Sequence, residues 1–261
     1  MANYMIVGAK QLGCEIFEVH NGKMTLHFDH DVVRKLWDNY YVPFVKGYFA
    51  ANGRFRSDEV KTGALLGCVG TCASATFFPK QVMPGDNQVH DIEMKVLPAP
   101  RFAGSEKVAV QQGAGMVVTT GTEAEINGAV TFLKWFTEPQ NNIAFSVESG
   151  YLPVTIAAND MDAIRASGLE LTDNMEQTLS GAVKTVRENE LYTPTAFAGG
   201  NAVRKILEYS MGDQVSADRD TVLERIAAGQ SAEAAVAEFL TDDYFEAWYQ
   251  ATLAQLQQYE G

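Results

Sequence analysis

The sequence predicts an α/β protein of 261 residues, with strands in the first half of the chain and helices in the second. Two observations carry this expectation. Short apolar or alternating runs, separated by turns rich in Gly, Asn and Pro, occur up to about residue 100. After Pro153, nearly every segment has the apolar spacing of a helix, with Ser or Thr at its start.

The first half contains four segments with strand character. Asn21-Gly22 is a turn between the first two of them and predicts a hairpin. The predicted strands are residues 14–20, 23–28, 64–69 and 92–97. Asp29 is expected to be the N-cap of a helix that follows the hairpin, and Phe44 to Phe49 continue its apolar spacing.

The clearest helix signal starts at Thr122. Glu125 lies three residues after this threonine, which is the spacing of a capping box. One apolar face follows, made of Ile126, Ala129, Val130, Leu133 and Phe136. Further helices are expected at residues 159–167, 172–187, 199–211, 217–228, 231–239 and 242–258. Gly212 and Gly229 lie where two of these helices should end.

Charge and hydropathy exclude several classes of protein. The formal net charge is −13 and no basic cluster exists, so nucleic acid is not an expected partner. No apolar run approaches the ~18 residues of a membrane span. The first nine residues lack the basic and apolar regions of a signal peptide, and Leu12-Gly13-Cys14 follows too short an apolar run for a lipoprotein cleavage site.

Candidate metal and redox sites are weak. Cys14, Cys68 and Cys72 are expected to be small buried hydrophobes, and a disulfide between Cys68 and Cys72 stays open. The cluster of His and Asp at residues 27–31 is interpreted as a turn and a helix cap. Residues 213–224 lack the oxygen ligands of a calcium loop. We expect no metal and no cofactor.

The chain also lacks the usual signatures of enzymes. It has no Gly-x-Ser-x-Gly elbow, no Gly-x-x-x-x-Gly-Lys phosphate loop and no His-Glu-x-x-His helix. Its four His offer few general bases. No catalytic residue is therefore assigned, and the protein is expected not to be an enzyme.

Several motifs instead occur in a recognisable order. Residues 60–73 keep a frame of Gly63, Gly70 and Thr71. Leu97-Pro98, Gly113-Ala114-Gly115 and Gly150-Tyr151-Leu152-Pro153 follow at their usual distances. The chain resembles the extracellular solute-binding proteins of ABC transporters, family 1, whose members include sugar- and maltodextrin-binding proteins. The resemblance extends over essentially the whole chain and depends on the order of the motifs.

The resemblance implies a two-lobe α/β fold of the periplasmic-binding-protein type II kind. Residues 1–96 would form part of the second lobe, 97–150 a return segment belonging to the first lobe, and 151–261 a helical segment packing on the second lobe. Residues 97–100 and 151–154 would be hinge or cleft segments. Because family members are longer and begin with a signal peptide, the chain is expected to be the C-terminal portion of such a protein.

The resemblance also implies a function, which is capture of a solute for the permease of an ABC transporter by hinge closure. The protein would be an extracellular or periplasmic monomer or a surface lipoprotein, and its ligand a sugar or oligosaccharide. The ligand residues would be Thr71, Ser74, Phe77, Ala114, Met116, Tyr151, Phe197 and Asn201.

Two departures bear on the ligand. Ala73 and Gly199-Gly200 stand near positions where the family often carries aromatics that stack on a sugar. Alternatives therefore stay open: a ligand-sensing or scaffold module of the same fold, or binding of a polyamine, a metal chelate or a phosphate ester.

Overall fold

The computed structural model describes residues 1–51, 56–85 and 88–261. The chain forms two compact units. Unit 1 consists of residues 1–52, 100–111 and 190–261, and unit 2 of residues 53–99 and 112–189. The chain therefore passes from one unit to the other four times. The lobe boundaries drawn from the sequence stay a prediction.

Unit 1 begins with helix α1 (Ala2–Gln11) and the hairpin of β1 (Phe17–His20) and β2 (Lys23–Leu26). The strands are antiparallel, and Phe17 pairs with Leu26. Asn21 and Gly22 form the turn with φ of 52° and 77°, the left-handed values that a two-residue hairpin turn needs. The predicted hairpin is confirmed, although both strands are shorter than expected.

Helix α2 (His30–Val45) follows the hairpin. The Asp29 carboxylate accepts a hydrogen bond of 2.9 Å from the backbone N–H of Val32, so the predicted cap is confirmed. The helix ends before Gly47, whose φ of 87° does not continue a helix. The expected continuation to Phe49 is wrong, because the chain turns away and leaves Phe49 exposed.

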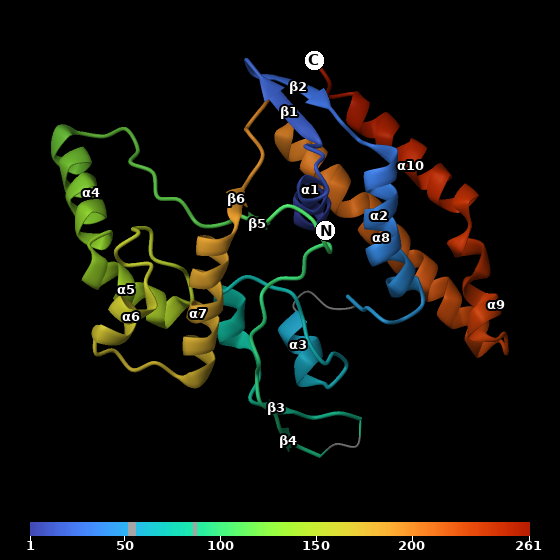
Figure 1. The fold of residues 1–261 in the computed structure, drawn as a ribbon, viewed down its shortest axis with the longest axis horizontal. Helices are drawn as coiled ribbons and strands as arrows, with labels where there is room; N and C mark the ends of the chain where they lie inside the picture. Colours follow the sequence, from blue (N-terminus) through green and yellow to red (C-terminus); the bar gives the residue numbers. More distant parts are fainter. Residues whose placement is uncertain (52–55, 86–87) are drawn as a thin grey trace. The chain divides into compact units, whose positions relative to one another are not determined.

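The C-terminal helices complete unit 1. They are α8 (Gly200–Ala227), the short α9 (Ala232–Val236), the 3-10 turn η2 (Ala237–Leu240) and α10 (Asp242–Gln257). Helix α8 packs against α1, α2 and α10 (Figure 1). The predicted break at Gly212 is wrong. Met211 and Val215 are buried on either side of Gly212, and this packing outweighs the roughly 1 kcal/mol that a glycine costs inside a helix.

The core of unit 1 contains a buried carboxylate. Asp218 of α8 is 6% exposed. It accepts hydrogen bonds from the hydroxyls of Tyr41 at 2.5 Å and Tyr244 at 2.8 Å, and from the amide of Gln214 at 3.0 Å. Burial and the adjacent carboxylate raise the pKa of the Tyr41 hydroxyl, and they raise that of Tyr244 to about 12. Asp218 thereby ties α2, α8 and α10 together.

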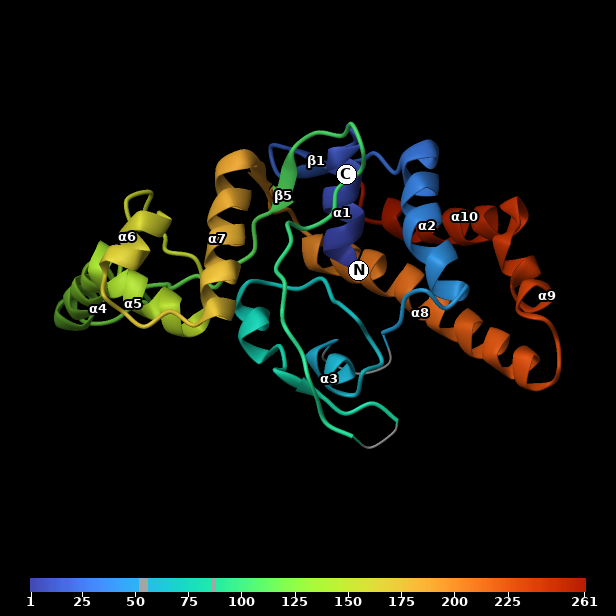
Figure 2. The same ribbon diagram turned by 60° about the horizontal axis from the view of Figure 1, so that its bottom comes forward.

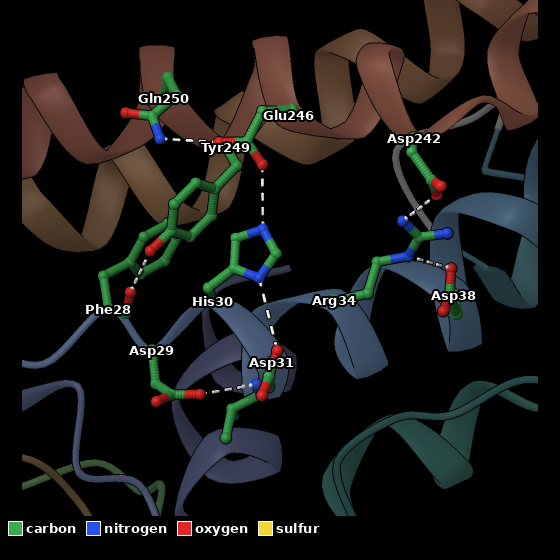
Figure 3. Close-up of polar contacts among 11 residues, drawn as sticks. Phe28, Asp29, His30, Asp31, Arg34, Asp38, Asp242, Glu246, Tyr249 and Gln250 are labelled. Atoms are coloured by element: carbon green, nitrogen blue, oxygen red, sulfur yellow. Dashed lines mark hydrogen bonds and ion pairs between the residues drawn. The ribbon is translucent and has the colours of Figure 1, made fainter.

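A second polar contact joins α2 to α10 near the surface (Figure 3). His30 Nε2 lies 2.9 Å from a carboxylate oxygen of Glu246, and the imidazole ring meets the Tyr249 ring edge-on. The Tyr249 hydroxyl donates a 2.6 Å hydrogen bond to the carbonyl of Phe28. The hydrogen bond to Glu246 raises the pKa of His30, because the carboxylate stabilises the charged imidazolium.

A two-stranded parallel sheet closes unit 1. Strand β5 (Val108–Val110) pairs with β6 (Glu190–Tyr192), and Val108 lies opposite Glu190. The amide of the buried Gln11 donates a 2.9 Å hydrogen bond to the carbonyl of Val108, which fixes β5 to the end of α1. Both strands lie next to points where the chain passes between the units.

Unit 2 is less regular in its first part. Helix α3 (Arg56–Lys61) is followed by the 3-10 turn η1 (Ala73–Phe77) and by two-residue strands β3 (Gln81–Val82) and β4 (His90–Asp91). The predicted buried strand at 64–69 is wrong, since this segment is irregular and Leu66 is fully exposed. The strand expected at 92–97 is also wrong. Only His90 and Asp91, just before it, pair with β3.

The second part of unit 2 is helical. It comprises α4 (Glu123–Phe136), α5 (Pro139–Ser149), α6 (Met161–Ala166) and α7 (Asp173–Glu188). Figure 2 shows α4 beside α5 and α6 beside α7. The capping box of Thr122 and Glu125 is confirmed. Helices α5, α6 and α7 share a small core, which consists of Ile143, Val147, Ala158, Ile164 and Leu179.

Helix α4 differs from the other long helices in its burial. Its apolar residues fall on one face, as predicted, yet none of its residues is buried. Within the described residues, no helix has both the length and the apolar character of a membrane span.

We expect Asp218→Ala to destabilise the protein by about 3 kcal/mol, because it leaves the buried Tyr41 hydroxyl without its acceptor. Urea unfolding followed by tryptophan fluorescence measures this change. Asp220→Ala, an exposed aspartate on the same helix, is the matched control and should change the midpoint little. Equal effects of both substitutions would contradict the structural role of Asp218.

The His30–Glu246 contact predicts a pH dependence of stability. The pKa of His30 is higher in the folded than in the unfolded chain, so its contribution is complete below the unfolded pKa of about 6.5. That contribution disappears as the pH rises through the folded pKa. The urea midpoint should therefore fall slightly more between pH 6 and pH 8 in the parent than in His30→Gln. An identical pH profile for both proteins would contradict the prediction.

Candidate ligand-binding surface

The end of α5 brings together several of the residues that the sequence predicts as ligand contacts. Gly150 ends α5 in the left-handed conformation, with φ of 74°. A side chain at this position would lie 3.0 Å from the carbonyl oxygen of Cys72 and 3.1 Å from Cα of Ala73. The backbone at the end of α5 therefore packs directly on the start of η1, and Tyr151 is the next residue in the chain.

Tyr151 itself is presented by a well-anchored segment. Asn142, which is 2% exposed, accepts a 2.7 Å hydrogen bond from the backbone N–H of Val154. Pro153 is buried, and Leu152 packs on the small core. Tyr151, at the start of this segment, remains 41% exposed. An exposed ring on a fixed backbone is suited to stacking against an apolar ligand face.

The η1 turn contributes hydroxyls and a second ring. Thr71 Oγ accepts a 3.1 Å hydrogen bond from the backbone N–H of Ser74, and the Ser74 hydroxyl donates a 2.6 Å bond to the Thr71 carbonyl. The Thr71 hydroxyl acts as an acceptor there and retains its proton for donation. Phe77, at the end of η1, is 70% exposed. Four predicted residues, Thr71, Ser74, Phe77 and Tyr151, thus belong to two segments in direct contact.

The other predicted residues lie elsewhere. Ala114 and Met116 belong to an irregular, exposed stretch between β5 and α4 in unit 2. Phe197 and Asn201 belong to unit 1. The Phe197 ring lies 5.8 Å from that of Phe17 and packs against the core, whereas Asn201 is exposed on the first turn of α8. A ligand role for these four residues stays a prediction.

The sequence reasoning did not identify a row of aromatic rings that leads to Tyr151. Neighbouring rings in this row have centroids 5.2 to 6.0 Å apart. The aromatic row consists of Trp135, Phe132, Phe136, Phe145 and Tyr151. Its members come from α4, α5 and the following segment. Trp135, at one end of the row, is 52% exposed.

A polar groove of about 880 Å³ forms a second feature of unit 2. It lies between residues 91–95 and the first half of α7, and none of the predicted ligand residues lines it. Lys80, Lys95 and Arg165 contribute positive charge, and nearby carboxylates balance it. Arg165 is already paired with Glu176 at 2.8 Å. The mixed charge and the existing ion pair give this groove no clear preference for a ligand.

Metal and thiol chemistry find little support in the described residues. In residues 1–51, 56–85 and 88–261, no three His, Cys, Asp or Glu side chains are arranged to hold a metal. The three cysteines are free. Cys68 is exposed and Cys14 and Cys72 are partly exposed, so the expected burial of all three is wrong. Burial raises the pKa of the Cys72 thiol, which keeps it protonated at neutral pH.

Comparison with known proteins identifies one family. The family model described as bacterial extracellular solute-binding protein matches residues 2–170, which is more than half of the chain. The matched region includes Thr71, Ser74, Phe77 and Tyr151 and excludes Phe197 and Asn201. No curated protein and no solved structure gives a significant match.

The contact between Gly150 and η1 can be tested with a matched pair of substitutions. Gly150 and Gly168 have nearly the same φ, 74° and 73°, but a side chain at Gly168 would meet nothing within 4 Å. Both Ala variants pay the left-handed strain of about 1 kcal/mol. We expect Gly150→Ala to cost roughly 1 kcal/mol more, because it also separates η1 from α5. Equal losses in urea unfolding would contradict the close approach.

Proposed function

The chain belongs to the bacterial extracellular solute-binding proteins, and from this premise we propose that it captures a carbohydrate at the surface formed by η1 and Tyr151. The family binds small solutes outside the cytoplasm and generally carries out no chemistry. The observation that carries the proposal is the packing of Gly150 on η1. It joins the segment that carries the exposed Tyr151 to the turn that carries Ser74 and the exposed Phe77.

The chemistry of this surface suits a sugar. A sugar has an apolar face of C–H groups, which an aromatic ring covers, and a rim of hydroxyls that need donors and acceptors. Tyr151 and Phe77 are the exposed rings. Thr71 and Ser74 are the nearby hydroxyls, and the Tyr151 phenol adds a donor and acceptor of its own. In this mode of binding, the rings provide contact area for the sugar, and the hydroxyls determine the orientation of the sugar.

The finer parts of the proposal rest on the family resemblance. We infer that the bound form delivers its solute to the permease of an ABC transporter, and that the protein closes over the ligand by hinge bending. The protein would work at the cell surface, as a lipoprotein, or in the periplasm. A polyamine or a metal chelate is the alternative ligand, and a ligand-sensing role without transport is the alternative function.

A thermal-shift screen tests the ligand class. A ligand at about 100 times its dissociation constant stabilises the folded state by about 2.7 kcal/mol. We expect stabilisation by at least one mono- or oligosaccharide and none by spermidine or a chelated metal. Stabilisation by spermidine alone would replace the carbohydrate with a polyamine, and no response to any compound would contradict binding by this chain.

The role of Tyr151 is tested separately. Tyr151→Ala should weaken binding of the active sugar by about tenfold, because stacking on one ring contributes roughly 1–1.5 kcal/mol. Tyr209→Ala removes a similarly exposed tyrosine from unit 1 and is the matched control. Isothermal titration calorimetry measures both. If the affinity of Tyr151→Ala for the sugar is unchanged, Tyr151 is not part of the binding site. That result would not contradict the family function.

A further inference from the structure

Unit 2 contains two cysteines, Cys68 and Cys72, whose pairing the sequence left open. Both thiols are free in the structure, and Cys68 is exposed while Cys72 is partly exposed. The third cysteine, Cys14, belongs to unit 1, where its thiol donates a 3.1 Å hydrogen bond to the carbonyl of His27. Cys68 and Cys72 are therefore the two cysteines of one compact unit, with three residues between them.

The two thiols differ in how firmly their backbone is held. Cys72 lies directly before η1, where its carbonyl accepts a 3.1 Å hydrogen bond from the N–H of Ala75. The carbonyl of Thr71 accepts one of 3.0 Å from the N–H of Ser74. In the part of the chain that the structure describes, the backbone of residues 65–70 forms no hydrogen bond. One thiol is thus held by a turn, and the other belongs to a segment that can adjust without losing a backbone hydrogen bond.

This segment already lies against η1 close to Cys68. A side chain at Gly70 would collide with Oγ of Ser74, so the backbone two residues after Cys68 touches the turn that begins after Cys72. Gly67 and Gly70 also give the segment a wide choice of φ. A disulfide requires Cα atoms about 4.4–6.8 Å apart. The unbonded segment lets Cys68 take up such a position beside Cys72.

The compartment supplies the remaining condition. Thiols of extracellular proteins meet an oxidising environment, in which disulfides form and persist. We propose that Cys68 and Cys72 form a disulfide outside the cytoplasm, which closes residues 68–72 into a ring that contains Thr71. The proposal rests on the extracellular location of the family and not on the identity of the solute. The ring restricts the backbone of Thr71 on the surface proposed for the solute, and reduction releases it.

The reaction is a thiol–disulfide exchange with a second disulfide, from a small molecule or an oxidoreductase. The more exposed Cys68 attacks a sulfur of that disulfide as a thiolate and releases one thiol. Cys72 then attacks the Cys68 sulfur of the mixed disulfide and releases the second thiol. The protein loses two protons and two electrons, and the oxidant gains both. Burial raises the pKa of both thiols, which argues against nucleophilic catalysis and makes the exchange slow at neutral pH.

Mass spectrometry of the purified full chain tests the pairing. The reduced protein is incubated overnight with oxidised and reduced glutathione, free thiols are alkylated, and trypsin digestion follows without reduction. Cys68 and Cys72 share the tryptic peptide of residues 62–80. We expect this peptide to lose two hydrogens and to carry no alkyl group, while Cys14 stays alkylated. Cys68 and Cys72 that remain alkylated or carry separate glutathiones would overturn the proposal, as would a disulfide to Cys14.

Two Ser variants form a matched pair for this test. Cys14→Ser should form the ring as the parent chain does. Cys72→Ser should accumulate glutathione on Cys68, because the thiol that resolves the mixed disulfide is missing. Equal levels of this adduct in the two variants would contradict resolution by Cys72.

Urea unfolding of Cys14→Ser shows whether the ring fits the fold. The oxidised form should unfold at a higher urea concentration than the reduced form, since the ring restricts the unfolded chain and its closure breaks no backbone hydrogen bond. A lower midpoint would show that pairing disrupts unit 2 and would overturn the proposal. None of these measurements needs a sugar, so their outcome is separate from that of the carbohydrate screen.

Discussion

The buried carboxylate of Asp218 is the interaction on which unit 1 depends most. It receives hydrogen bonds from the hydroxyls of Tyr41 and Tyr244 and from the amide of Gln214, so one charge connects three helices. A carboxylate in an apolar core is tolerated only when donors replace the water it has lost. The same requirement orients α2, α8 and α10, and thereby the aromatic core that Trp37, Phe245 and Trp248 form between them.

Unit 2 is organised by a different constraint, a close approach of two backbones. The missing side chain of Gly150 lets the end of α5 lie on η1, and Asn142 holds the following segment through the N–H of Val154. These contacts leave Tyr151 exposed on a fixed backbone. Local contacts of a few ångströms therefore position the surface that we propose for the solute.

The sequence predicted the parts of the fold that depend on neighbouring residues. Asp29 and Thr122 lie at helix starts, where a side-chain oxygen satisfies a free backbone N–H, and the structure has both caps. Asn21-Gly22 forms the hairpin turn because both residues tolerate positive φ. The strands predicted at 64–69 and 92–97 do not form. An apolar or alternating run shows only that burial is possible, and it becomes a strand only if another strand is available to pair with it.

For the candidate site, the motif around Gly150 and Tyr151 could be recognised in the sequence. Its contact with η1 could not be predicted from the sequence. The two segments are more than seventy residues apart, and only the packing of Gly150 on Cys72 and Ala73 brings them together. The sequence by itself determined the caps, the hairpin turn, most helices and the family, because these depend on local chemistry and on the order of motifs. The tertiary structure alone decided that α8 continues through Gly212, that no residue of α4 is buried and that Gly150 packs on η1. Those outcomes depend on which distant residues supply packing partners, and spacing along one chain does not contain that information.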